Sequence, residues 1–408
     1  MNNIYFNKYL KYFILYFKLK NQKGGQNEND VKCLNKISPK ISGPISCTRH
    51  RINDGEYIKD IYIFGDVYDI INPCKEEEGE SIEFQEYLGE LFSNSQKLID
   101  FFYEVSMKKE EEEFKDDFKD DYLNKIRNKF RNCLLKKSCP YPKVRFHYTD
   151  PRDTDLEIPY WEIVKILGPD FLSSPLPEAY NGEIKKVDEL TQEELDNFYY
   201  KKSDVIYDVC INEIFPMIND ASIGRDSDIY KKYANLLESD ILNNEINKAG
   251  RYSHNITNFS ESLIYYILKT DYGIFYNFIS NFYFYKDDKE TFKIIIGTNY
   301  LNILKNIEDI IFTIIAISSV LMDSYVLSRV LKDEFNMDES SEKYKSNYKK
   351  YGEEHINIKN IIIYAGESHC NNYREFLDIN NFEREDIAIH TEGSKYNQCI
   401  ELNSLLFD

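Results

Sequence analysis

Alternating hydrophobic and polar residues predict four strands in the first part of the chain. Pro44–Ile52 and Tyr57–Phe64 flank Asn53-Asp54-Gly55, a sequence that is typical of a tight hairpin turn. The apolar run Leu98–Val105 predicts a third, buried strand, and Lys143–Tyr148 predicts a fourth. We therefore expect a sheet that opens with a hairpin, and the second strand of that hairpin should be central.

A fifth strand is predicted near the other end of the chain, at Ile361 to Tyr364. It runs into Gly366-Glu367-Ser368-His369, and a helical pattern follows at once. Glycine lets the backbone turn sharply at a strand end, and open α/β folds place their sites at the carboxyl edge of the sheet. A histidine there can act as base, acid or metal ligand, so the sequence predicts a site at this edge. Ile387–His390 predicts one more edge strand.

Helical periodicity dominates the middle of the chain, from about residue 160 to residue 355. Two helices are also expected between the early strands, at Phe84–Leu98 and 108–137, and the second carries an acidic run that is typical of a solvated face. The clearest helical segments of the middle part are Thr191–Phe215, Asp226–Lys248, Asn258–Phe284 and Leu301–Lys332.

This order of elements predicts an α/β fold with a mixed, largely parallel central sheet that is formed by both ends of the chain. We expect an N-terminal extension or linker at 1–40. A discontinuous sheet domain should comprise 41–158 and 356–408, and a large helical insertion should comprise 159–355.

Two apolar segments are too interrupted or too short to span a membrane. The first, IYFNKYLKYFILYFKLK, contains Lys8, Lys11 and Lys18, whereas a spanning helix needs about 20 apolar residues. It predicts an amphipathic extension or translated sequence upstream of the true start, with attachment to a membrane surface as the minor alternative. Ile310–Met322 has 13 uncharged residues and predicts a buried core helix. No integral membrane span is expected.

Composition and charge exclude several classes of function. Hydrophobic residues make up 42% of the 408 residues, so a sizeable core is available. The net charge of −19 argues against nucleic-acid binding, which needs a basic face. Neither G-x-x-x-x-G-K-S/T nor G-x-G-x-x-G occurs, so no kinase, NTPase or dinucleotide site is expected.

The eight cysteines contain no C-x-x-C pair, and the two nearest are Cys133 and Cys139. A structural zinc site would normally show tighter pairs. Scattered cysteines without a secretory signal predict reduced thiols in a protein that is not secreted.

Polar residues follow the predicted strands at positions where they could meet. Gly65-Asp66-Val67-Tyr68 repeats the Gly-x-x-polar pattern that ends in His369, a third strand ends near Glu104, and a fourth holds His147. The ends of parallel strands lie at one edge of a sheet, so we expect these groups in one pocket. A carboxylate, a histidine and two turn residues can bind a metal or activate water.

These segments resemble the TIKI/TraB/erythromycin-esterase-like superfamily, which includes the haem-binding ChaN proteins. Its members have a Gly-x-x-His after an early strand, a glutamate at the end of the next strand and a second Gly-x-x-His after a late strand. YAGESH matches the late motif, and Glu104 in DFFYEV stands where the glutamate falls. LMDSYVLSRVL, with Asp323 and Arg329, stands where members carry an acidic/Arg pair. The segments ISGPISC, IYIFGDVYD, VRFHYTDPRD and IIIYAGESH also resemble uncharacterised proteins of giant viruses related to mimivirus.

The resemblance covers about residues 40–150 and 315–380. It implies a hydrolase of peptide or ester bonds that uses a divalent metal or a histidine base, located in the cytoplasm of an infected host cell or in the virion. The metal, and the small-molecule or peptide substrate, stay unidentified. The residues implied are His369 and Glu104 as base and metal ligands, Asp66 or Tyr68 as polariser, Arg329 as a further catalytic residue, and Gly65 and Gly366 on the cofactor side.

The chain departs from the family pattern at Tyr68, which stands where the family has histidine. A neutral tyrosine is a poor metal ligand, so the first motif is degenerate and enzymatic activity stays an open question. The alternative is an inactive structural or host-interaction protein on the same fold, with a viral or host protein bound by 159–355. A remote alternative is a metallophosphoesterase, because Gly65-Asp66-Val67-Tyr68-Asp69 matches G-D-x-x-D.

Overall fold

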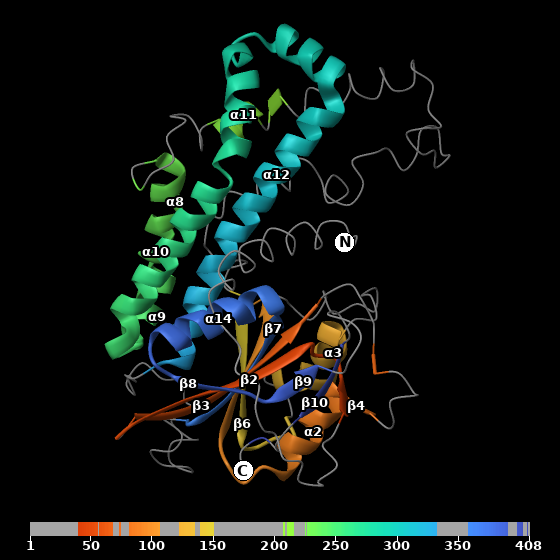
Figure 1. Cartoon of the computed structure of the whole chain (residues 1–408), viewed down its shortest axis with the longest axis vertical. Coiled ribbons are helices and arrows are strands. Elements are labelled where there is room, and N and C mark those ends of the chain that lie inside the picture. The colour runs from red at the N-terminus through yellow and green to blue at the C-terminus, as the bar shows by residue number, and fades with distance from the viewer. Residues whose placement is uncertain are drawn as a thin grey trace, which may run out of the picture. The chain divides into compact units, whose positions relative to one another are not determined.

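The computed structural model shows a mixed α/β protein with two compact units, one built on sheets and one helical (Figure 1). The sheet unit consists of the described residues of Asn3–Thr154, Glu245–Ile256 and Tyr325–Asp408. The helical unit consists of those of Asp155–Asn244 and Thr257–Ser324. The described residues are 40–55, 57–67, 73–74, 81–106, 122–134, 139–150, 207–208, 210–215, 225, 227–332, 358–390, 398–402 and 406.

The sheet unit is built on a six-stranded sheet of order β6-β5-β7-β3-β2-β8. Neighbours among β6, β5, β7 and β3 pair in parallel, and β2 pairs antiparallel with both β3 and β8. The expectation of a largely parallel sheet formed by both ends of the chain is confirmed. The strands are β2 (Ser46–Asp54), β3 (Tyr57–Asp66), β5 (Ile99–Ser106), β6 (Val144–Asp150), β7 (Asn360–Gly366) and β8 (Glu383–Asp386).

The predicted hairpin is present, and its second strand is internal. β2 and β3 pair along their whole length, from Ser46 with Gly65 to Asp54 with Tyr57. Gly55 has a φ of 63° in the turn, a conformation that glycine adopts without steric cost. β3 then lies between β2 and β7, so the hairpin feeds directly into the parallel part of the sheet.

One face of the sheet carries an aromatic core. Alternate residues of the strands, such as Phe64, Phe101 and Tyr364, point to this face because successive side chains of a strand point to opposite sides. Helices α2 (Phe84–Asn94) and α3 (Tyr122–Leu134) supply the facing apolar residues. Since burial of each large side chain contributes about 1.5–3 kcal/mol, this cluster is a major source of the unit's stability.

The opposite face is covered by α14 (Glu367–Ile379), which contacts β3, β7 and β2. Ile361 and Ile363 of β7 point to this face, while Ile362 and Tyr364 point to the aromatic core. β7 is therefore buried on both sides, which explains why its sequence is a continuous apolar run rather than an alternating one.

A second, four-stranded sheet has the order β4-β1-β10-β9. The strand expected at Ile387–His390 exists as β9 (Ala388–His390), but it lies at the edge of this second sheet. The other three strands have only three or four residues, too few for a periodic pattern, so the sequence does not predict them. They are β1 (Lys40–Ser42), β4 (Ser81–Glu83) and β10 (Cys399–Leu402).

Four cysteines form disulfides, Cys74 with Cys399 and Cys133 with Cys139. The prediction of reduced thiols is therefore wrong for these four residues. Sequence spacing could not reveal the first pair, because its members are 325 residues apart. Disulfides persist mainly in oxidising compartments, so cysteine usage no longer supports a reducing location. Among the described residues the free cysteines, all buried, are Cys47, Cys210 and Cys370.

The middle of the chain forms the predicted long helices, with different breaks. Most of their residues belong to the helical unit, while Glu245–Ile256 and the residues from Tyr325 on belong to the sheet unit. The segment expected at Asp226–Lys248 is split where Ser239 lies between two helices, and the backbone oxygen of Ser239 accepts from the Asn243 amide. The segment expected at Asn258–Phe284 is split at Asp271. Residues 191–206 and 333–355 lie outside the described residues. The helices are α8 (Asp228–Leu237), α9 (Asp240–Lys248), α10 (Ser253–Thr270), α11 (Tyr272–Phe282) and α12 (Lys289–Val330).

The last part of α12 is the only described segment with the length and hydropathy of a membrane span. This segment is Phe312–Val330, and 83% of its most apolar window is buried within the protein. A buried apolar helix is what the sequence predicted for Ile310–Met322, where Ile314, Ile317 and Leu321 are fully buried.

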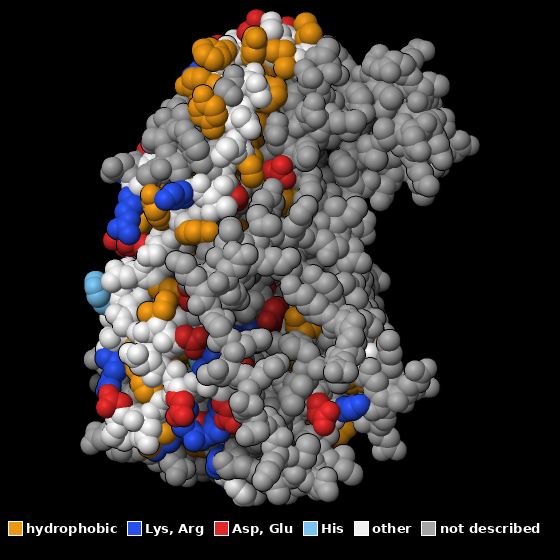
Figure 2. Space-filling view, viewed as in Figure 1, with side chains coloured by type: hydrophobic (Ala, Val, Ile, Leu, Met, Phe, Trp, Pro, Cys, Tyr) orange, Lys and Arg blue, Asp and Glu red, His pale blue; other side chains and the backbone are white. Residues whose placement is uncertain are grey.

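Large exposed hydrophobic side chains gather at the end of the helical unit where α11 is followed by α12 (Figure 2). Phe284 is 85% exposed, Ile294 66% and Tyr276 51%. Exposed apolar groups that gather in this way are typical of binding surfaces.

Candidate functional site

Two of the predicted site residues meet at the carboxyl edge of the parallel strands. Glu104 lies near the end of β5, and His369 lies in the first turn of α14, which directly follows β7. The Nε2 atom of His369 is 3.7 Å from Oε1 of Glu104. The other carboxylate oxygen, Oε2, accepts a 2.8 Å hydrogen bond from the backbone amide of Gly366. The pairing of β5 with β7 brings these three residues together.

The environment of this His369–Glu104 pair is largely shielded from water. The two side chains are 8% and 14% exposed, and the ring of Tyr373 stacks near the imidazole at 6.4 Å between centroids. A carboxylate that is shielded from water interacts more strongly with a charged imidazole, because the surrounding dielectric constant is lower than that of water. Glu104 can therefore stabilise the imidazolium that forms when His369 accepts a proton.

The residue next to the histidine, Cys370, is a packed thiol. Its Sγ donates to the backbone oxygens of Phe64 and Ala365, at 3.3 and 3.4 Å. Burial raises the pKa of Cys370 well above its usual value, so it stays protonated and is a poor nucleophile.

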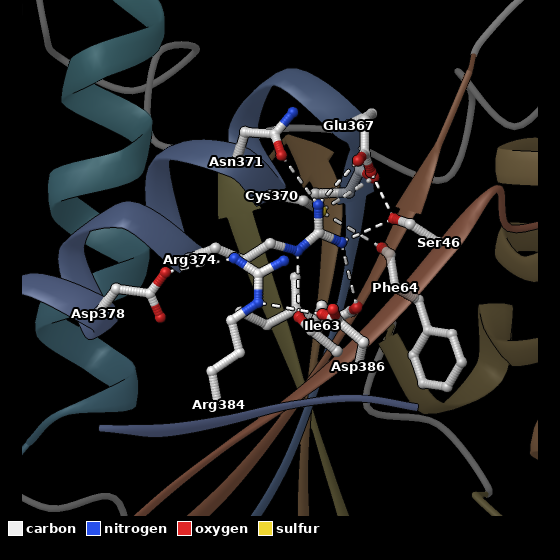
Figure 3. Close-up of polar contacts among 12 residues, drawn as sticks. Ser46, Ile63, Phe64, Glu367, Cys370, Asn371, Arg374, Asp378, Arg384 and Asp386 are labelled. Atoms are coloured by element: carbon white, nitrogen blue, oxygen red, sulfur yellow. Dashed lines mark hydrogen bonds and ion pairs between the residues drawn. The ribbon is translucent and has the colours of Figure 1, made fainter. Parts of the chain in front are cut away.

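A second polar group beside the pair fixes the start of α14 (Figure 3). The Glu367 carboxylate accepts from Ser46 Oγ at 2.6 Å and from Arg374 Nη1 at 2.8 Å. The Arg374 guanidinium also donates to Ser46 Oγ at 2.7 Å and to Thr48 Oγ1 at 3.0 Å. These bonds join α14 to β2, so they position the helix that carries His369.

Gly65 lies next to the Glu367 and Ser46 side chains of this group. A Cβ atom on Gly65 would be 1.6 Å from Oε2 of Glu367 and 2.7 Å from Oγ of Ser46. The absence of a side chain at Gly65 therefore makes room for the Glu367 carboxylate. Gly366, the other glycine expected on the cofactor side, contacts Glu104 through its amide.

Asp66 points away from the His369–Glu104 pair. It is in phase with Phe64 of β3, which faces the aromatic core, whereas Glu104 is in phase with Phe102 on the opposite face. Its carboxylate accepts from the Tyr364 hydroxyl, from Gln398 Nε2 at 2.8 Å and from the Val67 amide at 2.7 Å. The expected single pocket thus does not include Asp66.

The remaining predicted residues lie elsewhere or outside the described part. Tyr68 and Asp69 fall outside the described residues, so the arrangement of the first Gly-x-x-polar turn and of the G-D-x-x-D motif is described only as far as Val67. Arg329 of α12 contacts His147, with Nη2 at 3.3 Å from Nδ1, and Glu245 of α9, with Nη1 at 3.4 Å from Oε2.

His147 belongs to a second charged cluster, of which the sequence pattern indicates only His147 and Arg329. Its Nε2 lies 2.8 Å from Oδ1 of Asp100, and Arg145 donates to both oxygens of the same carboxylate. The imidazole stacks on the Phe102 ring at 4.5 Å between centroids. A contact on each ring nitrogen fixes the orientation of His147.

These contacts set the charges of the second cluster. Burial alone would raise the pKa of Asp100, but Arg145 and His147 outweigh it and hold the pKa of this carboxyl well below its usual range. Burial lowers the pKa of His147, although Asp100 opposes the shift, and Arg329 and Arg145 lower it further. Asp100 is therefore ionised and His147 is neutral near pH 7.

The described residues do not supply a complete metal site. They contain no group of three or more His, Cys, Asp or Glu side chains that could hold a metal ion. His369 and Glu104 supply two donor groups, and one oxygen of Glu104 is engaged by the Gly366 amide. Structural and catalytic metal sites in proteins normally use three or more protein ligands, so the described residues of this pair do not fit a metal site by themselves.

The fold and the site define a mixed α/β protein with a shielded histidine–carboxylate pair at the carboxyl edge of its parallel strands. No family model matches the chain, and no curated protein and no solved structure matches it either.

Proposed function

We propose that the protein is a hydrolase of peptide or ester bonds in which His369 is the general base. The observation that carries the proposal is the His369–Glu104 pair, 3.7 Å apart, at the edge of the sheet where α/β proteins bind their substrates. The resemblance of YAGESH and DFFYEV to motifs of the TIKI/TraB/erythromycin-esterase-like superfamily supports the same reaction class.

In this proposal, His369 removes a proton from the water that attacks the substrate carbonyl. Glu104 stabilises the resulting imidazolium, and its bond to the Gly366 amide keeps the carboxylate in place. The Ser46–Glu367–Arg374 group holds the first turn of α14 against β2 and so keeps His369 at the strand end.

The test is hydrolysis of ester and peptide panels, with and without Mn²⁺, Co²⁺ or Zn²⁺. Loss of the base in His369→Ala is expected to lower kcat/KM about 10²–10⁴-fold, and Glu104→Gln should also lower it. His254→Ala, at an exposed histidine of α10, is the matched control and should keep the wild-type rate. Equal rates for wild type and His369→Ala would refute the proposal.

A second candidate function is a non-catalytic protein that binds a viral or host protein through its helical region. The exposed hydrophobic side chains Tyr276, Phe284 and Ile294 favour it. Replacing Phe284 and Ile294 by serine should abolish co-purification of a stoichiometric partner. Turnover that disappears in Glu104→Gln would instead support the hydrolase.

A further inference from the structure

A buried histidine of the sheet unit links three elements at one edge of the six-stranded sheet. His50 of β2 is fully buried, and its Nε2 lies 3.1 Å from Oδ1 of Asp378 in the last turn of α14. The other oxygen of Asp378 accepts from Arg384 of β8 at 3.2 Å (Figure 3). We call His50, Asp378 and Arg384 the edge group, because together they join β2, α14 and β8.

Only one ring nitrogen of His50 has a hydrogen-bond partner among the described residues. Nε2 contacts Asp378, whereas Nδ1 is buried and unpaired. Because a carboxylate only accepts hydrogen bonds, the shared hydrogen is carried by Nε2. A second proton would therefore have to bind Nδ1, where it would create a buried N–H group without an acceptor.

The surroundings of the imidazole also disfavour its positive charge. Burial lowers the pKa of His50; the bond to Asp378 opposes the decrease, and Arg384 and Arg374 add to it. His50 is therefore neutral near pH 7. The charged residues on this face near His50 are Asp378 and Arg374 of α14, Arg384 and Asp386 of β8, and Lys59 of β3, which is diagonal to His50 in the β2–β3 register.

Apart from the edge group, β8 is held weakly to β2. It has four exposed residues, and it pairs with β2 only along Thr48–Arg51. The ion pair of Arg49 with Glu385 also joins the strands, but the Glu385 side chain is 56% exposed, and exposed pairs contribute little. Short segments with few buried contacts open locally at a small cost in free energy. Phe382 and Ile387 are buried on either side of β8, so they confine such opening to the strand itself.

We propose that the edge group is an acid-sensitive switch that releases β8 from β2 when His50 is protonated. Opening of β8 lets water reach the imidazole and solvate the charged form, which the closed state cannot do. A histidine in water has a pKa near 6.5, so below this pH the open state binds more protons and acid favours opening. Attraction between the imidazolium and Asp378 offsets this only in part, because Asp378 is 39% exposed and also paired with Arg384.

Release of β8 changes what the sheet presents to solution. The Thr48–Arg51 segment of β2 would expose unpaired backbone groups, and an extended strand can add to an edge of this kind. The switch acts at the end of α14 that is remote from His369, so the proposal does not depend on hydrolysis.

Hydrogen–deuterium exchange of the full chain at pH 7 and pH 5 tests the proposal. Protection factors, which correct for the intrinsic pH dependence of exchange, should fall about tenfold for the amides of β8 between these pH values. The amides of β7 should keep their protection, because this strand is buried on both sides. Unchanged protection of β8, or an equal fall in β7, would overturn the proposal.

Two histidine variants assign the response to His50. His50→Gln keeps an amide group near the Nε2 position but cannot be protonated, so β8 should stay protected at pH 5. His147→Gln is the matched control, because His147 is a second shielded histidine with a lowered pKa but lies on β6, at the other edge of the sheet. This control should show the wild-type fall. A tenfold fall in His50→Gln, or no fall in His147→Gln, would overturn the assignment.

A titration of the imidazole covers the case in which His50→Gln fails to fold. NMR titration of the wild-type protein should give a His50 pKa below 6.5. Arg384→Gln removes a nearby cation and should raise this pKa, whereas Asp378→Asn removes the anion and should lower it. A wild-type His50 pKa of 6.5 or above, or shifts in the same direction in both variants, would overturn the proposal.

Discussion

At the scale of single residues, Gly65 is a position where the protein needs the absence of a side chain. The Glu367 carboxylate occupies the space that a Cβ would take, and Ser46 and Arg374 hold that carboxylate in place. A glycine at the end of a strand suggests a turn or a ligand site from sequence alone. The reason at Gly65 is the close approach of a side chain that comes 302 residues later, a relation that no local pattern contains.

Gly65→Ala is expected to destabilise the protein by about 1–3 kcal/mol, because the new methyl group must displace Glu367. Urea unfolding measures the change. In a double-mutant cycle with Glu367→Ala, which removes the clashing carboxylate, the double variant should lose less stability than the sum of the losses in the two single variants.

Gly273→Ala is the matched control for that substitution. Gly273 lies on α11, and a Cβ there would meet nothing within 4 Å. Alanine is favoured over glycine in a helix, so stability should stay the same or rise by less than about 1 kcal/mol. Equal destabilisation by both variants would contradict the role assigned to Gly65.

A second residue-scale prediction concerns pH. The unfolded His147 takes up a proton near 6.5, and the folded one does so only at lower pH. Between these values the unfolded state binds more protons, so His147 costs stability as the pH falls below 6.5. His147→Gln should reduce the loss of unfolding free energy between neutral pH and about pH 5 by about 1 kcal/mol.

Urea unfolding at several pH values measures this difference. His254→Gln, at an exposed histidine, should follow the wild-type profile. His50 also has a lowered pKa, caused by burial, so the His147 variant should keep part of the pH dependence. A slope identical to wild type in His147→Gln would contradict the buried, neutral state of this residue.

At the scale of elements, the sequence predicts those with a clear apolar run or a clear apolar period. β7 and the start of α14 were predicted because a continuous apolar run ends in a glycine. The charged strand β8 was not, since its sequence ERED is fully exposed and carries no apolar period. α2 ends at Asn94, four residues before the predicted Leu98, because Ser95 adopts an extended conformation.

The candidate site shows the same limit of prediction. His369 and Glu104 could be placed at one edge because His369 closely follows one strand with a clear apolar pattern and Glu104 lies near the end of another. Asp66 was expected in the same pocket because the alternation along a strand separates its two faces but does not show which face of β3 lies on the same side of the sheet as Glu104 of β5. Asp100 was overlooked, although its position in phase with Phe102 and Glu104 is a signal that could have revealed it.

Packing of the sheet against α2 and α3 gives an element-scale prediction. Phe101 is fully buried and its ring contacts those of Phe92, Phe130 and Phe146. Phe101→Ala should lower the unfolding free energy by about 3–5 kcal/mol, from lost burial and a residual cavity. Phe284→Ala, at a phenylalanine that is 85% exposed, is the control, and its effect should stay within about 0.5 kcal/mol. Similar losses in both variants would contradict the assigned core.

At the scale of the whole molecule, the sheet unit is discontinuous in sequence and closed by distant contacts. The hydroxyl of Tyr364 donates to Asp66, across 298 residues, and Cys74 is bonded to Cys399, across 325. The Cys133–Cys139 bond, in contrast, spans 6 residues. These separations determine how much each link restricts the unfolded chain.

The two disulfides should therefore contribute unequally to stability. In the chain-entropy model, the longer loop gives about 6 kcal/mol and the shorter about 2 kcal/mol. Thermal unfolding of the double alanine variants, Cys74→Ala with Cys399→Ala and Cys133→Ala with Cys139→Ala, measures the difference. The second variant is the control for loss of a disulfide as such, and a larger loss in it would contradict the model.

The central position of β7 also has a consequence for how the protein is made. β7 lies between β5 and β3, yet Gly366 is translated 262 residues after its partner Glu104. At about 5–20 residues per second, a nascent chain spends roughly 15–50 s with both neighbouring strand edges unpaired. Unpaired strand edges of this kind can form hydrogen bonds with strands of other chains. Ribosome-bound folding intermediates should therefore depend on chaperones until β7 emerges.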